Sequence, residues 1–217
     1  MWCIGKITAE YRERMYALLA LYALPYNPLE PVICMDEKSK QLLENTRIPI
    51  PPKSGGAKKE DYEYRRKGTS NIFLAVEPKA GQRYLKVTRH RKRSDFAKFI
   101  KELSEKYSDA HKIHIALDNL NTHFEKSFYE TFSKMEAGNI LKRIEFHYTP
   151  KHASWLNMAE IEIGILDHQC LDRRLPNEKK LRKEIKCWQA KRNRQKKKIN
   201  WTFTKQDADK KLSKHYI

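Results

Sequence analysis

The 217-residue sequence lacks several features that identify common classes of protein. It has no apolar run of about 18 residues, which a membrane-spanning helix requires, and charged residues interrupt the apolar stretch near its start, which argues against a signal peptide. Its four cysteines lie far apart with no CxxC pair, so neither a zinc ribbon nor a disulfide scaffold is expected. The sequence therefore predicts a cytosolic protein with reduced thiols and no membrane partner.

Two catalytic motifs are also missing. The eight histidines form no HxxxH pair, which makes a zinc-site enzyme a poor interpretation. There is no GxxxxGK[ST] loop either, so we expect no nucleotide cofactor and no ATP-driven chemistry.

Positive charge, by contrast, is abundant. Lys and Arg number 45 against 27 Asp and Glu, which gives a formal net charge of +18. A charge of this size and sign attracts polyphosphate partners and makes nucleic acid the leading class. Charge alone is equally compatible with a basic protein that binds nucleic acid non-specifically.

Hydrophobic periodicity predicts an α/β domain with a mixed sheet. The expected helices cover residues 7–22 with Thr8 as cap, 94–107 with Ser94 as cap, 122–135, 155–169, and a strongly basic 177–198. The expected strands are Val32–Met35, Tyr62–Val76 and Gln82–Thr88 as a hairpin, 112–118, and 143–149. Prolines, glycines and lysines between Ile48 and Asp61 indicate a loop.

Two of these strands run into an aspartate. Asp36 follows the apolar run Val32–Met35, Asp118 follows KIHIAL, and Glu160 lies in the second turn expected for the helix over 155–169. Three such carboxylates would hold magnesium or manganese, because these hard ions prefer oxygen ligands, and two ions about 4 Å apart suit phosphodiester cleavage. Spacing leaves alternatives open: Glu37 competes for the first position, and Glu162 and Asp167 compete for the third.

A family resemblance supplies a template for this choice. The segments PVICMDEKS, IALDNLNTH and HYTPKHASWLNMAEIEIGIL, together with the ending KKINWTFTKQDADKKL, resemble the catalytic blocks of bacterial insertion-sequence transposases in the mariner-related DDE superfamily. The resemblance covers most of the chain and assigns the metal-binding, catalytic acids to Asp36, Asp118 and Glu160.

The resemblance implies a ribonuclease-H-like fold, two Mg²⁺ or Mn²⁺ ions, hydrolytic nicking at transposon ends, and attack of the freed 3'-hydroxyl on target DNA. It also implies a homodimer acting on paired ends. It divides the chain into a helical leader (1–30), a catalytic domain (31–170) and a basic helical extension (171–217). Full-length relatives carry N-terminal helix-turn-helix units that are not expected here, so the alternative is a catalytically idle remnant that binds DNA non-specifically.

The resemblance also implies that polar residues beside these blocks position DNA or the acids, and nearby basic residues are candidates for phosphate contacts. Asn119, Asn121 and His123 accompany the second acid, and Ser154 belongs to the loop before the third. Arg65, Arg66, Arg89 and Arg91 offer further phosphate contacts. The residues predicted to contact DNA are Lys151, His152, Trp155, Asn157, Arg182, Lys183, Arg192 and Arg194.

Overall fold

The computed structural model describes residues 6–217, so Cys3 lies outside the described residues. Its five-stranded sheet has the order β3-β2-β1-β4-β5. The β1–β2 and β2–β3 pairs are antiparallel, whereas β1–β4 and β4–β5 are parallel. The strands are β1 (Val32–Asn45), β2 (Tyr64–Glu77), β3 (Gln82–Thr88), β4 (Ile113–Leu117) and β5 (Ile144–Tyr148). The mixed sheet confirms the predicted α/β class.

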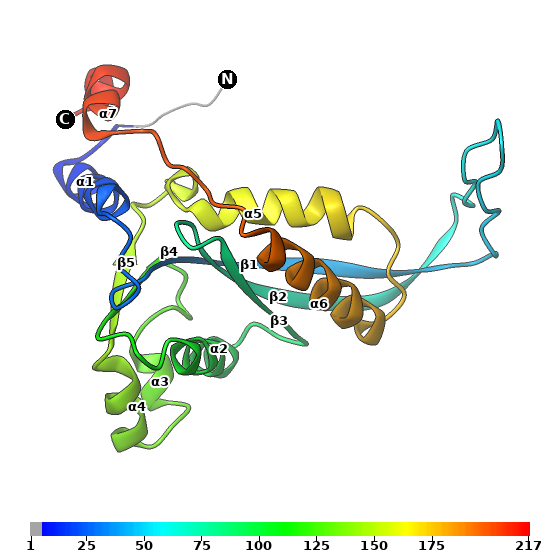
Figure 1. The fold of residues 1–217 in the computed structure, drawn as a ribbon, viewed down its shortest axis with the longest axis horizontal. Coiled ribbons are helices and arrows are strands. Elements are labelled where there is room, and N and C mark those ends of the chain that lie inside the picture. Colours follow the sequence, from blue (N-terminus) through cyan, green and yellow to red (C-terminus); the bar gives the residue numbers. More distant parts are fainter. Residues whose placement is uncertain (1–5) are drawn as a thin grey trace.

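Helices cover both faces of this sheet (Figure 1). One face packs against α2 (Arg93–Lys106), α3 (Lys126–Tyr129) and α4 (Lys134–Leu141); the other packs against α5 (Met158–Leu166) and α6 (Glu178–Gln195). Helices α1 (Ala9–Ala23) and α7 (Lys205–Leu212) lie together at the β5 end of the sheet. Strand residues alternate between the two apolar clusters, since successive side chains point to opposite faces.

Strand β1 is longer than predicted. The apolar run ends at Met35, but β1 continues to Asn45, so Asp36 is its fifth residue and does not lie at its end. Pairing with β4 stops at Cys34, whereas pairing with β2 continues to Asn45. The sequence pattern missed this part because backbone hydrogen bonds to β2 hold it, with half-exposed polar side chains in place of an apolar stripe.

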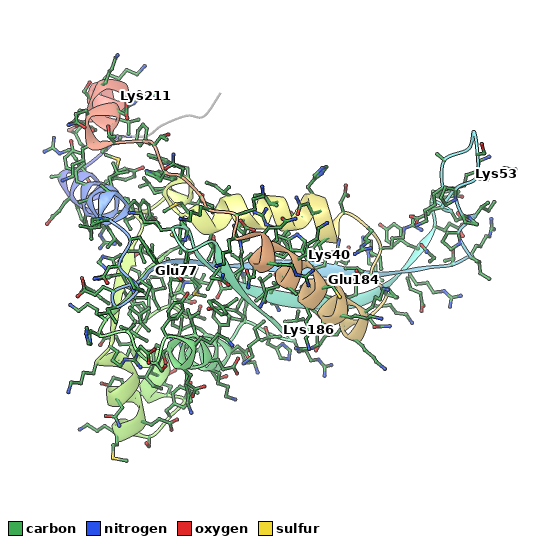
Figure 2. All side chains as sticks on the ribbon, viewed as in Figure 1. Lys40, Lys53, Glu77, Glu184, Lys186 and Lys211 are labelled. Carbon is green, nitrogen blue, oxygen red and sulfur yellow. The ribbon has the colours of Figure 1, made fainter. Side chains whose placement is uncertain are left out.

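The extended β1–β2 hairpin forms an arm that projects from the body of the protein (Figure 1). Its tip is the predicted loop over 48–61, where isolated bridges join Ile50 to Lys59 and Lys53 to Gly56. Lys53 lies at the far end of this arm (Figure 2). The proline- and glycine-rich segment is therefore confirmed as a loop outside the core.

Two helix predictions need correction. Ser94 does not cap α2, because the helix begins one residue earlier, at Arg93, and the Asp95 carboxylate accepts from the Lys92 backbone N–H at 2.9 Å. The single helix predicted over 122–135 is instead the short α3 followed by α4, which Ser133 caps through the Glu136 N–H. Of the three phenylalanines in this segment, Phe128 is the one that is fully buried, because α3 ends directly after it, at Tyr129.

The basic helix α6 docks on the sheet by its predicted face, with Leu181, Ile185 and Trp188 buried. Its polar side chains also complete the edge strand β3: Gln189 accepts from the Leu85 N–H at 2.9 Å, and Asn193 accepts from the Arg83 N–H at 2.8 Å. Such contacts satisfy backbone groups that an edge strand leaves unpaired. Helix α6 is therefore part of the same folded body as the sheet.

The turn between β2 and β3 fixes the end of α6. Gly81 has a φ of +69°, and a side chain there would approach the Lys196 backbone to 2.6 Å. Lys196 itself ends α6 in the left-handed region, and the Ile199 N–H then donates to the Pro78 carbonyl at 3.1 Å. The predicted turn is thus confirmed, and glycine is required by the close approach of two chain segments.

Residues from the segment predicted as a C-terminal extension share the main core. Ala208 and Leu212 of α7 belong to the same apolar cluster as Met15 and Leu18 of α1. Helix α1 is confirmed, with the Thr8 side chain accepting from the Tyr11 N–H. The domain boundaries at 30 and 170 remain a prediction. Among residues 6–217, no helix is both long and apolar enough to cross a membrane.

Candidate active site

Strand pairing places two of the predicted acids side by side. Cys34 of β1 is paired with Ala116 of β4, and both strands run in the same direction. Asp36 and Asp118 each lie two residues further along, at the point where the two strands stop pairing. This edge, formed by the carboxyl ends of parallel strands, is where α/β folds commonly build their sites.

Helix α5 brings the third acid to the same edge. The Asn157 side chain caps α5 by accepting from the Ala159 N–H at 3.1 Å, and its amide donates to the Met35 carbonyl at 2.8 Å. This bond joins the start of α5 to the residue before Asp36. Glu160 lies in the first turn of α5, one turn earlier than predicted, and its side chain is exposed.

The three carboxylates interact electrostatically. Burial, and then the charges of Glu160 and Asp118, raise the pKa of Asp36 to about 7, against one opposing hydrogen bond from the Glu37 N–H at 2.7 Å. A carboxylate near two others is costly to ionise unless a cation compensates it. The charges of Glu160 and Asp118 are therefore near enough to affect the ionisation of Asp36.

A buried histidine holds the second acid. The Nδ1 of His123 lies 2.6 Å from the Asp118 carboxylate, and its Nε2 lies 2.8 Å from that of Glu37. Burial opposes the charged imidazole, but the bonds to these two carboxylates outweigh it and raise the pKa of His123 to about 9. Burial likewise opposes ionisation of Asp118, yet His123 lowers its pKa. The pair is ionised at neutral pH, which orients Asp118.

The competing acids have other partners. Glu37 is 3% exposed and bound to His123. Glu162 is fully buried and accepts from Arg83 at 2.9 Å and from Arg192 at 2.9 and 3.0 Å. Asp167 forms an ion pair with Lys38 at 2.5 Å. Each competing acid thus has a partner within the protein, and the choice of Asp36, Asp118 and Glu160 stays a prediction from the resemblance.

The donor set suits a divalent cation with oxygen ligands. Asp36, Asp118 and Glu160 supply only carboxylate oxygens, which Mg²⁺ and Mn²⁺ prefer. The oxygens of these three acids do not all lie within 4.8 Å of one another. Among the described residues, only another cluster, on β4 and β5, has ligand atoms from three residues that close together.

The residues predicted to contact DNA differ in exposure. Lys151, His152, Lys183 and Arg194 are exposed, and Arg182 is exposed with Glu178 as its partner. Trp155 is 37% exposed and packs edge-on against Phe203.

Two of the residues predicted to contact DNA have partners within the protein. Asn157 is 1% exposed and caps α5, and the Arg192 guanidinium is held by Glu162. Their contact with DNA stays a prediction. No local sequence pattern signals that Glu37 binds His123 or that Arg91 lies near Asp118, whose pKa its charge helps to lower.

The sequence places this chain in a known class. Residues 31–182 match the DDE superfamily endonuclease family, and the chain belongs to it. No curated protein matches the sequence significantly.

Solved structures share the fold. The Mos1 transposase paired-end complex with left transposon end is similar with a TM-score of 0.59 and 12% identity, over 88% of this chain and 57% of that chain. The Mos1 mariner paired end complex with Mn is similar with a TM-score of 0.57 and 12% identity, over 91% and 64%. This chain thus spans less than two thirds of these relatives, and the similarity confirms the ribonuclease-H-like fold.

Proposed function

We propose that this chain is the catalytic part of a cut-and-paste DNA transposase, which hydrolyses phosphodiester bonds at transposon ends. The freed 3'-hydroxyl then attacks a phosphodiester of the target DNA, joins to its phosphorus and displaces the 3'-oxygen of the target strand. The observation that carries the proposal is the convergence of Asp36, Asp118 and Glu160 at one edge of a ribonuclease-H-like sheet. Membership of the DDE superfamily endonuclease family supports the same chemistry.

Asp36, Asp118 and Glu160 would hold two Mg²⁺ or Mn²⁺ ions. When bound, such ions activate the attacking oxygen and stabilise the leaving one. Mos1 transposase has been solved with Mn and with Mg, which supports this cofactor here. His123 would orient the Asp118 carboxylate. Asn157 would hold the start of α5, which carries Glu160, against Met35.

DNA is the proposed partner, and the exposed cations are the proposed contacts. Lys151, His152 and Trp155 precede the third acid, Arg91 lies near the second, and Arg182, Lys183 and Arg194 line the exposed side of α6. Phosphate contacts of this kind position DNA without reading its sequence. A homodimer on paired ends, and a location with the nucleoid in the cytoplasm, follow from the same proposal.

The test is cleavage of labelled duplex DNA and joining of a 3'-hydroxyl end to plasmid, with Mn²⁺ or Mg²⁺ in the buffer. Asp118→Asn removes one metal-binding charge, and we expect cleavage to fall by roughly 100-fold or more, since metal contacts supply several kcal/mol. Asp172→Asn, at an exposed acid after α5, is the matched control and should keep full activity.

Binding measured in parallel separates the alternatives. If wild type and Asp118→Asn bind DNA tightly and salt-dependently and neither cleaves it, the chain is a catalytically idle DNA-binding protein and the proposal is wrong. Cleavage that prefers RNA–DNA hybrids in competition would instead assign a ribonuclease H-type nuclease.

A further inference from the structure

A second cluster of metal-ligand side chains lies on β4 and β5, away from the acids. His114 of β4 is paired with Glu145 of β5, and His147 lies two residues further along β5 beside Ala116. All three side chains therefore point to the same face of the sheet. His114 precedes Asp118 by four positions, or about 13 Å along an extended strand, whereas His147 is level with Ala116, about 7 Å before Asp118. The cluster therefore neighbours the candidate active site along the strands but includes none of its three acids.

The ligand atoms are already gathered. The Nδ1 of His114 lies 3.0 Å from the Nε2 of His147, which in turn lies 3.4 Å from a Glu145 oxygen. Among the described residues, this is the one set of three His, Cys, Asp or Glu side chains whose ligand atoms all lie within 4.8 Å of one another. A tetrahedral zinc ion with bonds of about 2.0 Å separates its ligand atoms by about 3.3 Å, so the three groups need to move only slightly.

The surroundings favour an ordered site. The side chains of His114 and His147 are 14% and 18% exposed, and that of Glu145 is 43% exposed. Because all three residues belong to paired strands, little conformational entropy is lost when they bind an ion. Lys112 donates to one Glu145 oxygen at 2.9 Å, which leaves the other oxygen, the one near His147, available.

We propose that His114, Glu145 and His147 form a site for a late first-row divalent cation, and that the ion bound there is Zn²⁺. Two imidazole nitrogens and one carboxylate oxygen suit Zn²⁺, whereas Mg²⁺ requires oxygen ligands. The ion fastens β5, which is the edge strand of the sheet, to β4, which carries Asp118 at its end. The three side chains leave the fourth tetrahedral position to water, and the site takes no part in the proposed DNA cleavage.

The test is Zn²⁺ titration of chelator-treated protein by calorimetry, with millimolar Mg²⁺ present to occupy the carboxylate site. We expect one Zn²⁺ per chain and a higher melting temperature with Zn²⁺, because an ion that binds only the folded state stabilises it. His147→Gln and Glu145→Gln should each weaken binding by roughly tenfold or more. His111→Gln, at an exposed histidine just before β4, is the matched control and should bind as the wild type does.

Co²⁺ absorption gives an independent result. Wild-type protein should show the visible absorption bands of Co²⁺ bound at low coordination number by nitrogen and oxygen ligands, and His147→Gln should lose these bands. Cys187→Ser tests the exposed thiol and should leave the bands unchanged. The proposal is overturned if Zn²⁺ fails to bind the wild type, if His147→Gln and Glu145→Gln bind it unchanged, or if Cys187→Ser abolishes binding. None of these results depends on DNA cleavage.

Discussion

Replacing His123 tests how the second acid is held. The imidazole is fully buried between the carboxylates of Asp118 and Glu37. His123→Gln keeps a hydrogen-bonding side chain of similar reach but removes the positive charge. The Glu37 carboxylate, which is 3% exposed, then lacks its cationic partner. Breaking a buried pair in this way costs on the order of 3–5 kcal/mol.

The pH dependence of stability gives a second magnitude for the same interaction. The pKa of His123 rises from its ordinary 6.5 to about 9 in the folded protein. The stabilisation is therefore complete below pH 6.5 and is lost as the pH rises through 9, and it amounts to about 3 kcal/mol. The lowered pKa of Asp118 reflects the same ion pair and adds no separate contribution.

Urea denaturation of the wild type and His123→Gln from pH 6 to 10 measures both magnitudes. The two free energies of unfolding should differ most at pH 6 and converge toward pH 10. Glu37→Gln and the double variant complete a cycle in which the two substitutions should be non-additive by more than about 1 kcal/mol. A constant difference across this pH range, or simple additivity, would refute the reasoning.

Three further predictions concern the core, the acids and the basic helix. Glu162→Gln leaves the buried Arg83 and the nearly buried Arg192 without a counter-charge. It should therefore lower the free energy of unfolding, measured in urea, by about 3–5 kcal/mol. The control Glu178→Gln, which removes an exposed ion pair with Arg182, should lower it by less than about 1 kcal/mol. Since the pKa of Asp36 is about 7, the apparent Mn²⁺ affinity measured by titration should rise about tenfold per pH unit up to that value and then level off. In the metal-free protein, the raised pKa of this acid should lower the free energy of unfolding as the pH rises from 4 to 7. A flat affinity profile would contradict this. Replacing Lys183 and Arg194 together by Gln should weaken binding to any duplex and lower the slope of log affinity against log salt by about 2 in fluorescence anisotropy, and an unchanged slope would exclude both residues from phosphate contact.

Most of the sheet was predictable because its strands carry strong local signals. The apolar runs Val32–Met35 and Ile113–Leu117 are fully or largely buried, and the turn at Gly81 separates the two antiparallel strands. What the sequence did not reveal depends on contacts between distant segments. The outer half of β1 is paired along β2 without an apolar pattern, and the phenylalanines at 124, 128 and 132 share a helical spacing but not a common environment.

In the candidate site too, some residues are signalled by the local sequence, and others are identified only by contacts between distant segments. Asp36 and Asp118 stand out in sequence because each follows an apolar run, whereas the sequence does not distinguish Glu37 from a metal ligand. Its actual partner, His123, lies 86 positions away in the sequence, and no local pattern records that separation. The His114 and His147 pair was missed for the same reason, because strand register and not helical spacing brings the rings together.

Helix α5 carries both a predicted site residue, Glu160, and a residue whose partners are distant in sequence, Glu162. Glu160 and Glu162 are two positions apart, which places them on opposite sides of a helix with about 100° per residue. Glu160 is exposed beside Asp36, and Glu162 is buried between Arg83 of β3 and Arg192 of α6. Because the buried ion pairs accept only one rotation of the helix, they also fix the direction of the Glu160 carboxylate. The basic helix α6 therefore contributes to the candidate active site through Arg192, a residue that its composition alone assigns to DNA.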